Sequence, residues 1–121
     1  MSEEIIKYIE DKLSAGFGAE YPVYTEQTAQ IQIPCFMLKL LDQRQEHIGR
    51  AQYWRSCLVC LQFLAGEWEL AHKTAERLFL ILEKVEVSGV PVRGRKMRYD
   101  LTDKVLSFFV EYNLNIFKES V

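Results

Sequence analysis

The chain contains few cysteines and prolines, three of each in 121 residues, and it lacks a long apolar run. An odd number of cysteines without framework spacing fits a reducing cytoplasm better than a disulfide scaffold. The first residues lack a basic region followed by an apolar stretch, so we expect no secretory signal. No apolar segment is long enough to cross a bilayer. The sequence therefore predicts a cytoplasmically made protein with no membrane partner.

An excess of charge of one sign is also missing. Fifteen basic residues stand against seventeen acidic ones, and the formal net charge is −2. No global electrostatic field therefore favours DNA, RNA or an anionic membrane. The apolar fraction of 49% is ordinary for a globular protein, and a chain of this length buries roughly two-thirds of its unfolded surface. We expect one domain over residues 1–121.

The residues that could carry chemistry do not form a recognisable site. The glycines are scattered, with no P-loop and no dinucleotide fingerprint. Cys57 and Cys60 have the spacing of a metal knuckle, but residues three apart on a strand point to opposite faces. His47 and His72 lack ligand spacing and sit in no nucleophile or base motif. We predict buried structural thiols and no catalytic, metal or cofactor site, with a small enzyme kept as a rival class.

The stretch from Tyr53 to Lys84 combines two periods. Residues 53–64 alternate between two faces, as in a strand. After a break at Ala65–Gly66 the period becomes about 3.6, and this pattern predicts a long central helix on the apolar face of a sheet. The strand face and the helical stripe consist, respectively, of Tyr53, Arg55, Cys57, Val59, Leu61 and Phe63, and of Leu70, Ala71, Thr74, Leu78, Ile81, Leu82 and Val85.

The N-terminal part predicts a helix, a short strand and a loop. The helical stripe of Ile5, Ile6, Ile9 and Leu13 fades at the following glycines. Residues 21–25 predict a short strand, and Glu26–Gln32 is polar enough to be a loop.

The segment from Pro34 to Gln45 changes character along its length. Residues 35–38 are apolar on both faces, and residues 42–47 are polar on both faces, before a turn near Ile48–Gly49. A hairpin with an apolar base and a polar distal half should project beyond its own core. Two interpretations stay open: a solvated loop, or an arm that reaches a neighbouring subunit, which Tyr53 and Trp54 at the transition support.

The C-terminal part predicts two hairpins. Short apolar segments flank Ser88–Gly89, a tight-turn signal. A turn near residues 102–104 precedes the most regular strand, whose apolar face is Leu106, Phe108, Val110, Tyr112, Leu114 and Ile116. The predicted fold class is α+β, with a mainly antiparallel sheet and an N-terminal helix and a long central helix packed on it.

A basic run precedes the last hairpin and puts four cations into six residues, Arg93, Arg95, Lys96 and Arg98. If the run is extended, the first two share one face and the last two share the other. It could be a solvated edge strand that uses charge to resist unwanted pairing. It could also bind an anionic partner, an acidic protein patch more readily than nucleic acid, because the net positive charge and known motif of a nucleic-acid domain are missing.

The order of elements and several words of the sequence resemble a small family of phage and prophage proteins classed with the tail terminators of long-tailed phages. The likeness covers nearly the whole chain. It is most specific at the strand start Pro34-Cys35-Phe36, at Arg93-Gly94 with Met97, and at the ending VLSFFVEY of residues 105–112. None of these words is a catalytic signature.

The resemblance implies a mixed fold of helices on a sheet, assembled as a ring, typically a hexamer, at the head-proximal end of a virion tail. Such a ring stops growth of the tail tube and joins the head connector, so the implied partners are copies of itself, the tube protein and the connector or stopper protein, with DNA as passing cargo. A related alternative is another head–tail connector protein; a rival is a small nucleic-acid-binding module that uses the basic strand. The candidate contact residues are Arg50, Trp54, Arg93, Arg95, Lys96 and Arg98.

Overall fold

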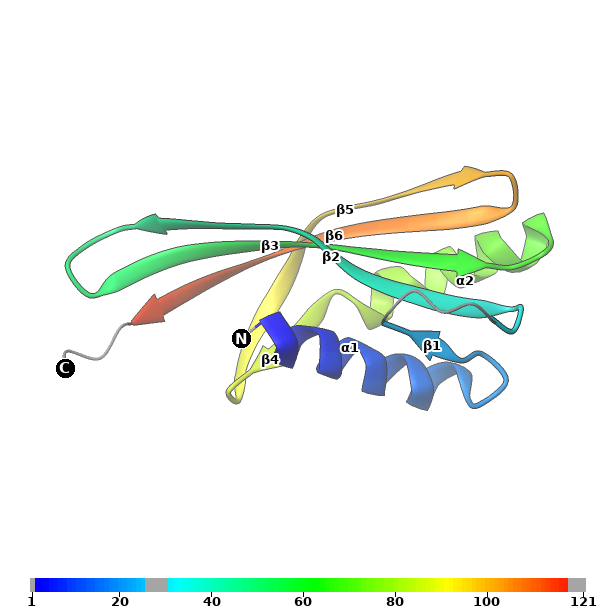
Figure 1. Ribbon diagram of the computed structural model, residues 1–121, viewed down its shortest axis with the longest axis horizontal. Helices are drawn as coiled ribbons and strands as arrows, with labels where there is room; N and C mark the ends of the chain where they lie inside the picture. The colour runs from blue at the N-terminus through cyan, green and yellow to red at the C-terminus, as the bar shows by residue number, and fades with distance from the viewer. Residues whose placement is uncertain (1, 26–30, 118–121) are drawn as a thin grey trace.

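The structure, a computed structural model, describes residues 2–25 and 31–117. Two helices and six strands follow one another along the chain. They are α1 (Ser2–Phe17), β1 (Val23–Tyr24), β2 (Cys35–His47), β3 (Gln52–Leu64), α2 (Trp68–Ile81), β4 (Lys84–Val87), β5 (Val90–Thr102) and β6 (Val105–Phe117). The predicted α+β class is confirmed, and the N-terminal helix, the short strand and both hairpins form where the patterns place them (Figure 1).

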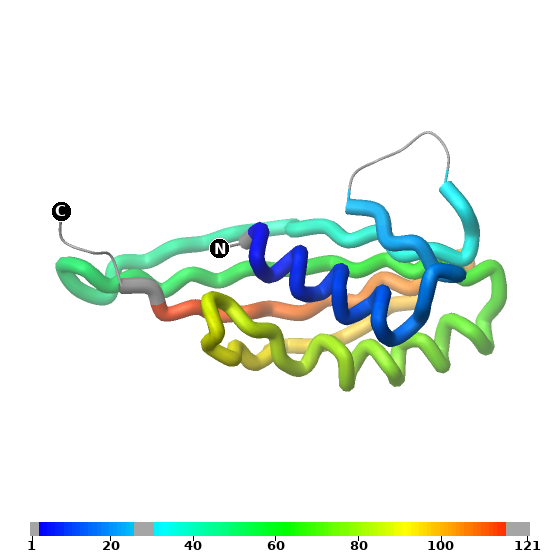
Figure 2. The backbone as a smooth tube through the Cα atoms, turned by 90° about the horizontal axis from the view of Figure 1, so that it is seen from below, coloured from blue at the N-terminus to red at the C-terminus, as the bar shows by residue number. Residues whose placement is uncertain are grey.

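The strands form one curled sheet in the order β1-β2-β3-β6-β5-β4. The short β1 pairs parallel with β2, and every other pairing is antiparallel, so the sheet is mixed. Both helices cover the same face of this sheet, as Figure 2 shows, and no helix of residues 2–25 and 31–117 lies on the opposite face. We call this second face the outer face.

The core lies between the helices and the inner face of the sheet. The predicted α1 stripe is buried at Ile5, Ile9 and Leu13. The predicted face of β3 is buried from Cys57 to Phe63 and only half-buried at Tyr53 and Arg55, and that of β6 is buried from Leu106 to Leu114, while the Ile116 side chain lies outside the described part. Arg77 of α2 places its guanidinium 3.9 Å from the ring centroid of Phe17 and donates a hydrogen bond to the Gly16 carbonyl, which ties the two helices together. The fully buried side chains include Phe36, Leu61, Phe63, Leu78, Leu106, Phe108 and Tyr112.

The prediction of a long central helix is wrong, because α2 has only 14 residues and residues 84–87 form a strand. The Leu82 and Glu83 carbonyls, which would accept helical hydrogen bonds from residues 86 and 87, have other donors. The Tyr112 hydroxyl donates to Leu82 and the Gly94 N–H donates to Glu83, both at 2.7 Å. Val85 faces the core from β4. Its apolar side chain therefore matches the helical period in the sequence, although the residue lies in a strand.

The hairpin of β2 and β3 projects beyond the helices, as predicted from its polar distal half (Figure 1). Residues 41–51 are all exposed, whereas the base at Cys35 and Phe36 is fully buried. The far half of β6 pairs with β3 as far as Gln52 and Phe117 and so runs out along the same projection. We call residues 41–56, together with β6 from Asn113 onward, the arm. In the predicted loop over Glu26–Gln32, residues 26–30 lie outside the described residues.

Candidate interaction surface

The strand β5 is bent, and the bend leaves part of β6 without a neighbour. Its first residues pair with β4, from Val90 with Val87 to Arg93 with Lys84, and its later residues pair with β6 only from Gly94 onward. Gly94 is required at the crossing, because a Cβ there would lie 2.7 Å from the Leu82 carbonyl oxygen and 2.8 Å from a Val110 methyl group. Real Cβ atoms do not approach other atoms so closely. From Asn113 to Phe117, β6 therefore has no strand on its β5 side among the described residues.

A groove of about 450 Å³ lies where β5 turns away from β6. We call it the edge groove. One wall comes from the β4–β5 hairpin, whose turn is held to α1 by a 2.9 Å hydrogen bond from the Ser88 N–H to a Glu4 carboxylate oxygen. Val90 is 60% exposed at this wall, beside the apolar Val87, Pro91 and Val92. The lining residues are Trp54, Val87, Ser88, Val90, Pro91, Val92, Arg93, Arg95, Asn113, Leu114 and Asn115.

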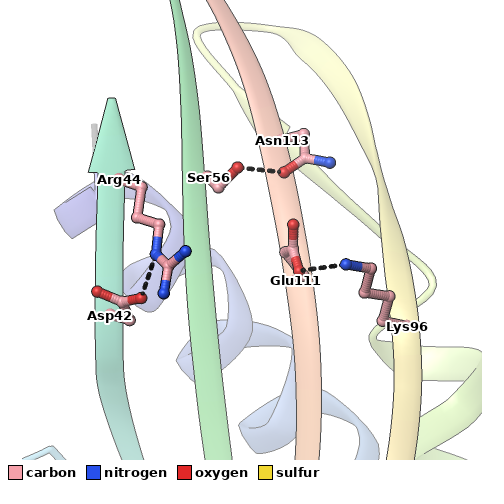
Figure 3. Close-up of polar contacts among 6 residues, drawn as sticks. All are labelled: Asp42, Arg44, Ser56, Lys96, Glu111 and Asn113. Atoms are coloured by element: carbon pink, nitrogen blue, oxygen red, sulfur yellow. Dashed lines mark hydrogen bonds and ion pairs between the residues drawn. The ribbon is translucent and has the colours of Figure 1, made fainter. Parts of the chain in front are cut away.

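A second groove of about 460 Å³ crosses the outer face of the arm. We call it the outer-face groove. Its polar side chains are partly paired with one another, as Figure 3 shows: Arg44 Nε lies 2.9 Å from Asp42 Oδ2, and Lys96 Nζ lies 3.8 Å from Glu111 Oε2. Between them the Ser56 hydroxyl donates a 2.8 Å hydrogen bond to Asn113 Oδ1. The lining residues are Asp42, Arg44, Glu46, Trp54, Ser56, Leu58, Lys96 and Glu111.

Trp54 lines both grooves. It stands on the outer face of β3, opposite Glu46 of β2 and Asn115 of β6. Its side chain is half-buried, although neither α1 nor α2 covers this face. Large aromatic rings in such a position are enriched at protein interfaces. Of the predicted contact residues, Trp54 has the setting most typical of a binding surface.

The basic run does not divide between two faces as its spacing predicted. A bulge between Arg95 and Arg98 inserts an extra residue, and Lys96 takes a left-handed φ of 52°. The alternation therefore slips by one position, and all four cations are exposed, while Val92, Met97, Tyr99 and Leu101 pack towards the core.

The predicted contact residues lie in four places. Arg93 and Arg95 line the edge groove beside Trp54, and Lys96 lines the outer-face groove. Arg98 lies further along β5, with its guanidinium 4.2 Å from the centroid of the Phe109 ring. Arg50 is exposed in the turn at the tip of the arm and lines neither groove. The structure therefore brings four of the six together around the bend in β5.

The thiols are buried and separated, as their positions on strands predicted. Cys57 is fully buried on the inner face, and Cys60 is 5% exposed on the outer side of the same strand. None of the three cysteines is in a disulfide. Burial raises the pKa of each thiol, including Cys35, above its ordinary value and so keeps it protonated and unreactive.

The histidines lie in aromatic surroundings. The His47 ring is 4.4 Å from that of Tyr53 on the arm. The His72 ring stacks at 6.1 Å on Trp68 of α2, and its Nδ1 lies 3.4 Å from the Tyr99 hydroxyl. Within residues 2–25 and 31–117, no three His, Cys, Asp or Glu side chains are grouped to hold a metal ion. No helix in that part of the chain is long and apolar enough to cross a membrane.

The open edge of β6 and the edge groove were missed by the sequence analysis. The groove depends on which strands separate after Gly94, and local periodicity does not report strand separation. The sequence of residues 88–98 gave a weak indication of a special backbone here, because a predicted hairpin, a glycine and four cations follow one another. A glycine inside a strand often marks a bulge or a close backbone approach.

Comparisons with known proteins agree with this architecture. A family model described as "Phage tail terminator protein" matches residues 4–121. No curated protein matches the chain. One solved protein structure, whose name carries no functional term, is 13% identical and matches 99% of this chain and 94% of its own, with a TM-score of 0.52. At that identity the match shows a shared fold alone.

Proposed function

Because the chain belongs to the phage tail terminator family, whose members are structural components of phage tails, we propose that copies of it join into a ring, a hexamer, on the head-proximal end of a tail tube. The ring stops growth of the tube and presents the surface that the head connector or stopper protein binds. The protein acts through its shape and its exposed edges, without a reactive centre.

The projecting arm is the observation that carries this proposal. The strand hairpin has eleven consecutive exposed residues, 41–51, and nothing in the described part of the chain covers them. Isolated two-stranded ribbons gain little stability by themselves. Here β6 pairs alongside β3 and widens the ribbon to three strands. The third strand stiffens the arm, so that it can reach a neighbouring molecule.

The charge distribution supports contacts with protein over contacts with nucleic acid. Two cations of the basic run are engaged within the subunit, Lys96 with Glu111 and Arg98 over the Phe109 ring. The net charge of −2 would let DNA pass through a ring without strong phosphate contacts.

A tube-growth experiment tests the proposal. Tube protein is allowed to polymerise with increasing amounts of this chain, and tube lengths are measured by electron microscopy. We expect shorter tubes, each with a disc of density at one end, and a capped end that takes up no further tube subunits. Unchanged lengths and bare ends at saturating concentration would reject it, and salt-sensitive binding of generic duplex DNA would favour the nucleic-acid alternative.

A further inference from the structure

The backbone of β6 is ready to accept another strand. Along Asn113–Phe117 it bonds to β3 on one side, while its pairing with β5 ends at Tyr112 opposite Gly94. A row of unpaired N–H and C=O groups at a sheet edge is a template for an added strand. Natural sheets often blunt such an edge with lysine, proline or a very short strand. The open edge is the last part of the 13-residue strand β6. Its described side chains are Asn113, Leu114 and Asn115, which include no lysine and no proline.

The edge groove gives that added strand a place for its side chains. The groove runs beside the open part of β6 and is walled by Val87, Val90, Pro91 and Leu114. Strand addition takes its affinity from main-chain hydrogen bonds and its specificity from pockets for alternate side chains. The exposed Val90 therefore marks where an apolar side chain of the incoming strand would be covered.

The opposite edge of the same sheet has a matching strand. On the edge away from β3, β2 pairs with β1 only at Phe36 and Met37. From Leu38 to His47 that edge has no strand partner among the described residues. Two apolar side chains on this hairpin are uncovered, Leu41 at 51% and Ile48 at 55% exposed. Leu41 occupies the bulge in β2 between Leu40 and Asp42. The hairpin therefore offers an open edge and apolar side chains together.

Charge also matches across the two edges. Arg93 and Arg95 line the edge groove, and neither forms an ion pair within residues 2–25 and 31–117. On the open part of β2, Asp42 is paired with Arg44, while Lys39 near the base and Glu46 near the tip have no ion pair in the same part of the chain. Two unpaired arginines disfavour contact of the edge groove with a second edge groove, whereas the unpaired Glu46 carboxylate on the hairpin can meet them.

We propose that the open edge of β6, with the edge groove, binds the open edge of β2 from a second copy of this chain. The inference rests on the self-assembly proposed above and names the surfaces that join. Because β2 and β6 both run antiparallel to β3, they point the same way within a subunit. A rotation about an axis close to the strand direction carries one copy to the next and pairs the two strands in parallel. The contact is head-to-tail, and such contacts close into rings when the rotation per copy permits.

A pair of charge substitutions tests the groove. Val90→Glu places a carboxylate in the edge groove, while Leu80→Glu places one on an equally apolar site of α2 that is 72% exposed and lines neither groove. We expect Val90→Glu to raise the concentration for half-assembly by about tenfold or more, and Leu80→Glu to leave it unchanged. Equal effects of the two variants, or none from Val90→Glu, would overturn the proposal. Circular dichroism and thermal unfolding confirm that each variant is folded.

Cross-linking tests the direction of the contact. The native thiols are 0%, 0% and 5% exposed, so a cysteine introduced at Leu41 or Val90 is the reactive one. With a short bismaleimide reagent, we expect dimers when Leu41→Cys and Val90→Cys proteins are mixed, and none from either variant alone. Dimers from Val90→Cys alone would show an edge-groove-to-edge-groove contact, and an absence of mixed dimers in assembled protein would also reject the proposal. Rings that persist in Val90→Glu without mixed cross-links overturn this inference alone, whereas wild-type protein that never assembles overturns the proposed function.

Discussion

The Tyr112 hydroxyl donates a 2.7 Å hydrogen bond to the Leu82 carbonyl oxygen inside the core. The bond joins the middle of β6 to the residue that follows α2, where the chain leaves the helix for β4. It lies one residue before the open edge of β6 begins. The stability of the fold and the shape of the edge groove therefore depend on the same few contacts.

Replacing Tyr112 by phenylalanine should destabilise the fold. The change keeps the ring but leaves the buried Leu82 carbonyl without its donor, which costs about 1–3 kcal/mol. Urea unfolding followed by circular dichroism measures the loss. Tyr53→Phe, at a half-buried position on the arm, is the control and should change the free energy of unfolding much less. Equal losses would contradict the role given to the hydrogen bond.

The stability should also fall at alkaline pH. Burial, with a smaller contribution from Tyr8, raises the pKa of Tyr112 well above its ordinary value. Above about pH 10 the unfolded chain releases this proton while the folded chain keeps it, so the free energy of unfolding decreases as pH rises. The buried thiols act in the same direction from about pH 8.5, so the comparison is with Tyr112→Phe. That variant should show a shallower fall above pH 10; parallel curves would show that Tyr112 does not contribute.

Gly94→Ala should be strongly destabilising. The new methyl group would lie 2.7 Å from the Leu82 carbonyl oxygen and 2.8 Å from Val110, and overpacking of this kind costs about 1–3 kcal/mol. Gly49→Ala at the tip of the arm is the matched control, because a Cβ there meets no atom within 4 Å. Thermal unfolding should separate the two variants clearly. A Gly94→Ala protein as stable as the control would mean that β5 does not cross so close to Leu82.

The arm should be needed for assembly but not for folding. In Trp54→Ala combined with Arg50→Ala, we expect a folded protein that assembles poorly, because Trp54 lines both grooves and Arg50 stands at the exposed tip. Size-exclusion chromatography with light scattering measures assembly, and near-ultraviolet circular dichroism monitors the fold. Normal assembly of the double variant would reject the arm as a contact surface.

Much of the fold follows from local periodicity, because the central strands β3 and β6 bury one face along much of their length. The alternation in β3 and β6 selected the residues that are buried, and the polar distal half of β2 predicted the projection. Two expectations failed for a tertiary reason. The helical stripe in the sequence extends to Val85, but that residue lies in β4, which pairs with β5. The bulge at Lys96 shifts the side chains of the basic run between the two faces of β5.

The candidate surface was predictable only in part. Trp54 and the basic residues stood out as charged or aromatic groups on a strand, and four of the six selected residues meet near the bend. The open edge of β6 has no sequence signature, because its backbone is unpaired only where β5 departs from it. Exposed apolar residues such as Val90 resemble core residues in the sequence, since their burial depends on the neighbouring strand.

Native mass spectrometry of the purified chain over a range of concentrations, alone and with tube protein, tests whether copies of this subunit close on one another. We expect one dominant assembly of fixed copy number, a hexamer, that grows no further as concentration rises. A monomer under all of these conditions, or a ladder of masses with no preferred size, would contradict it.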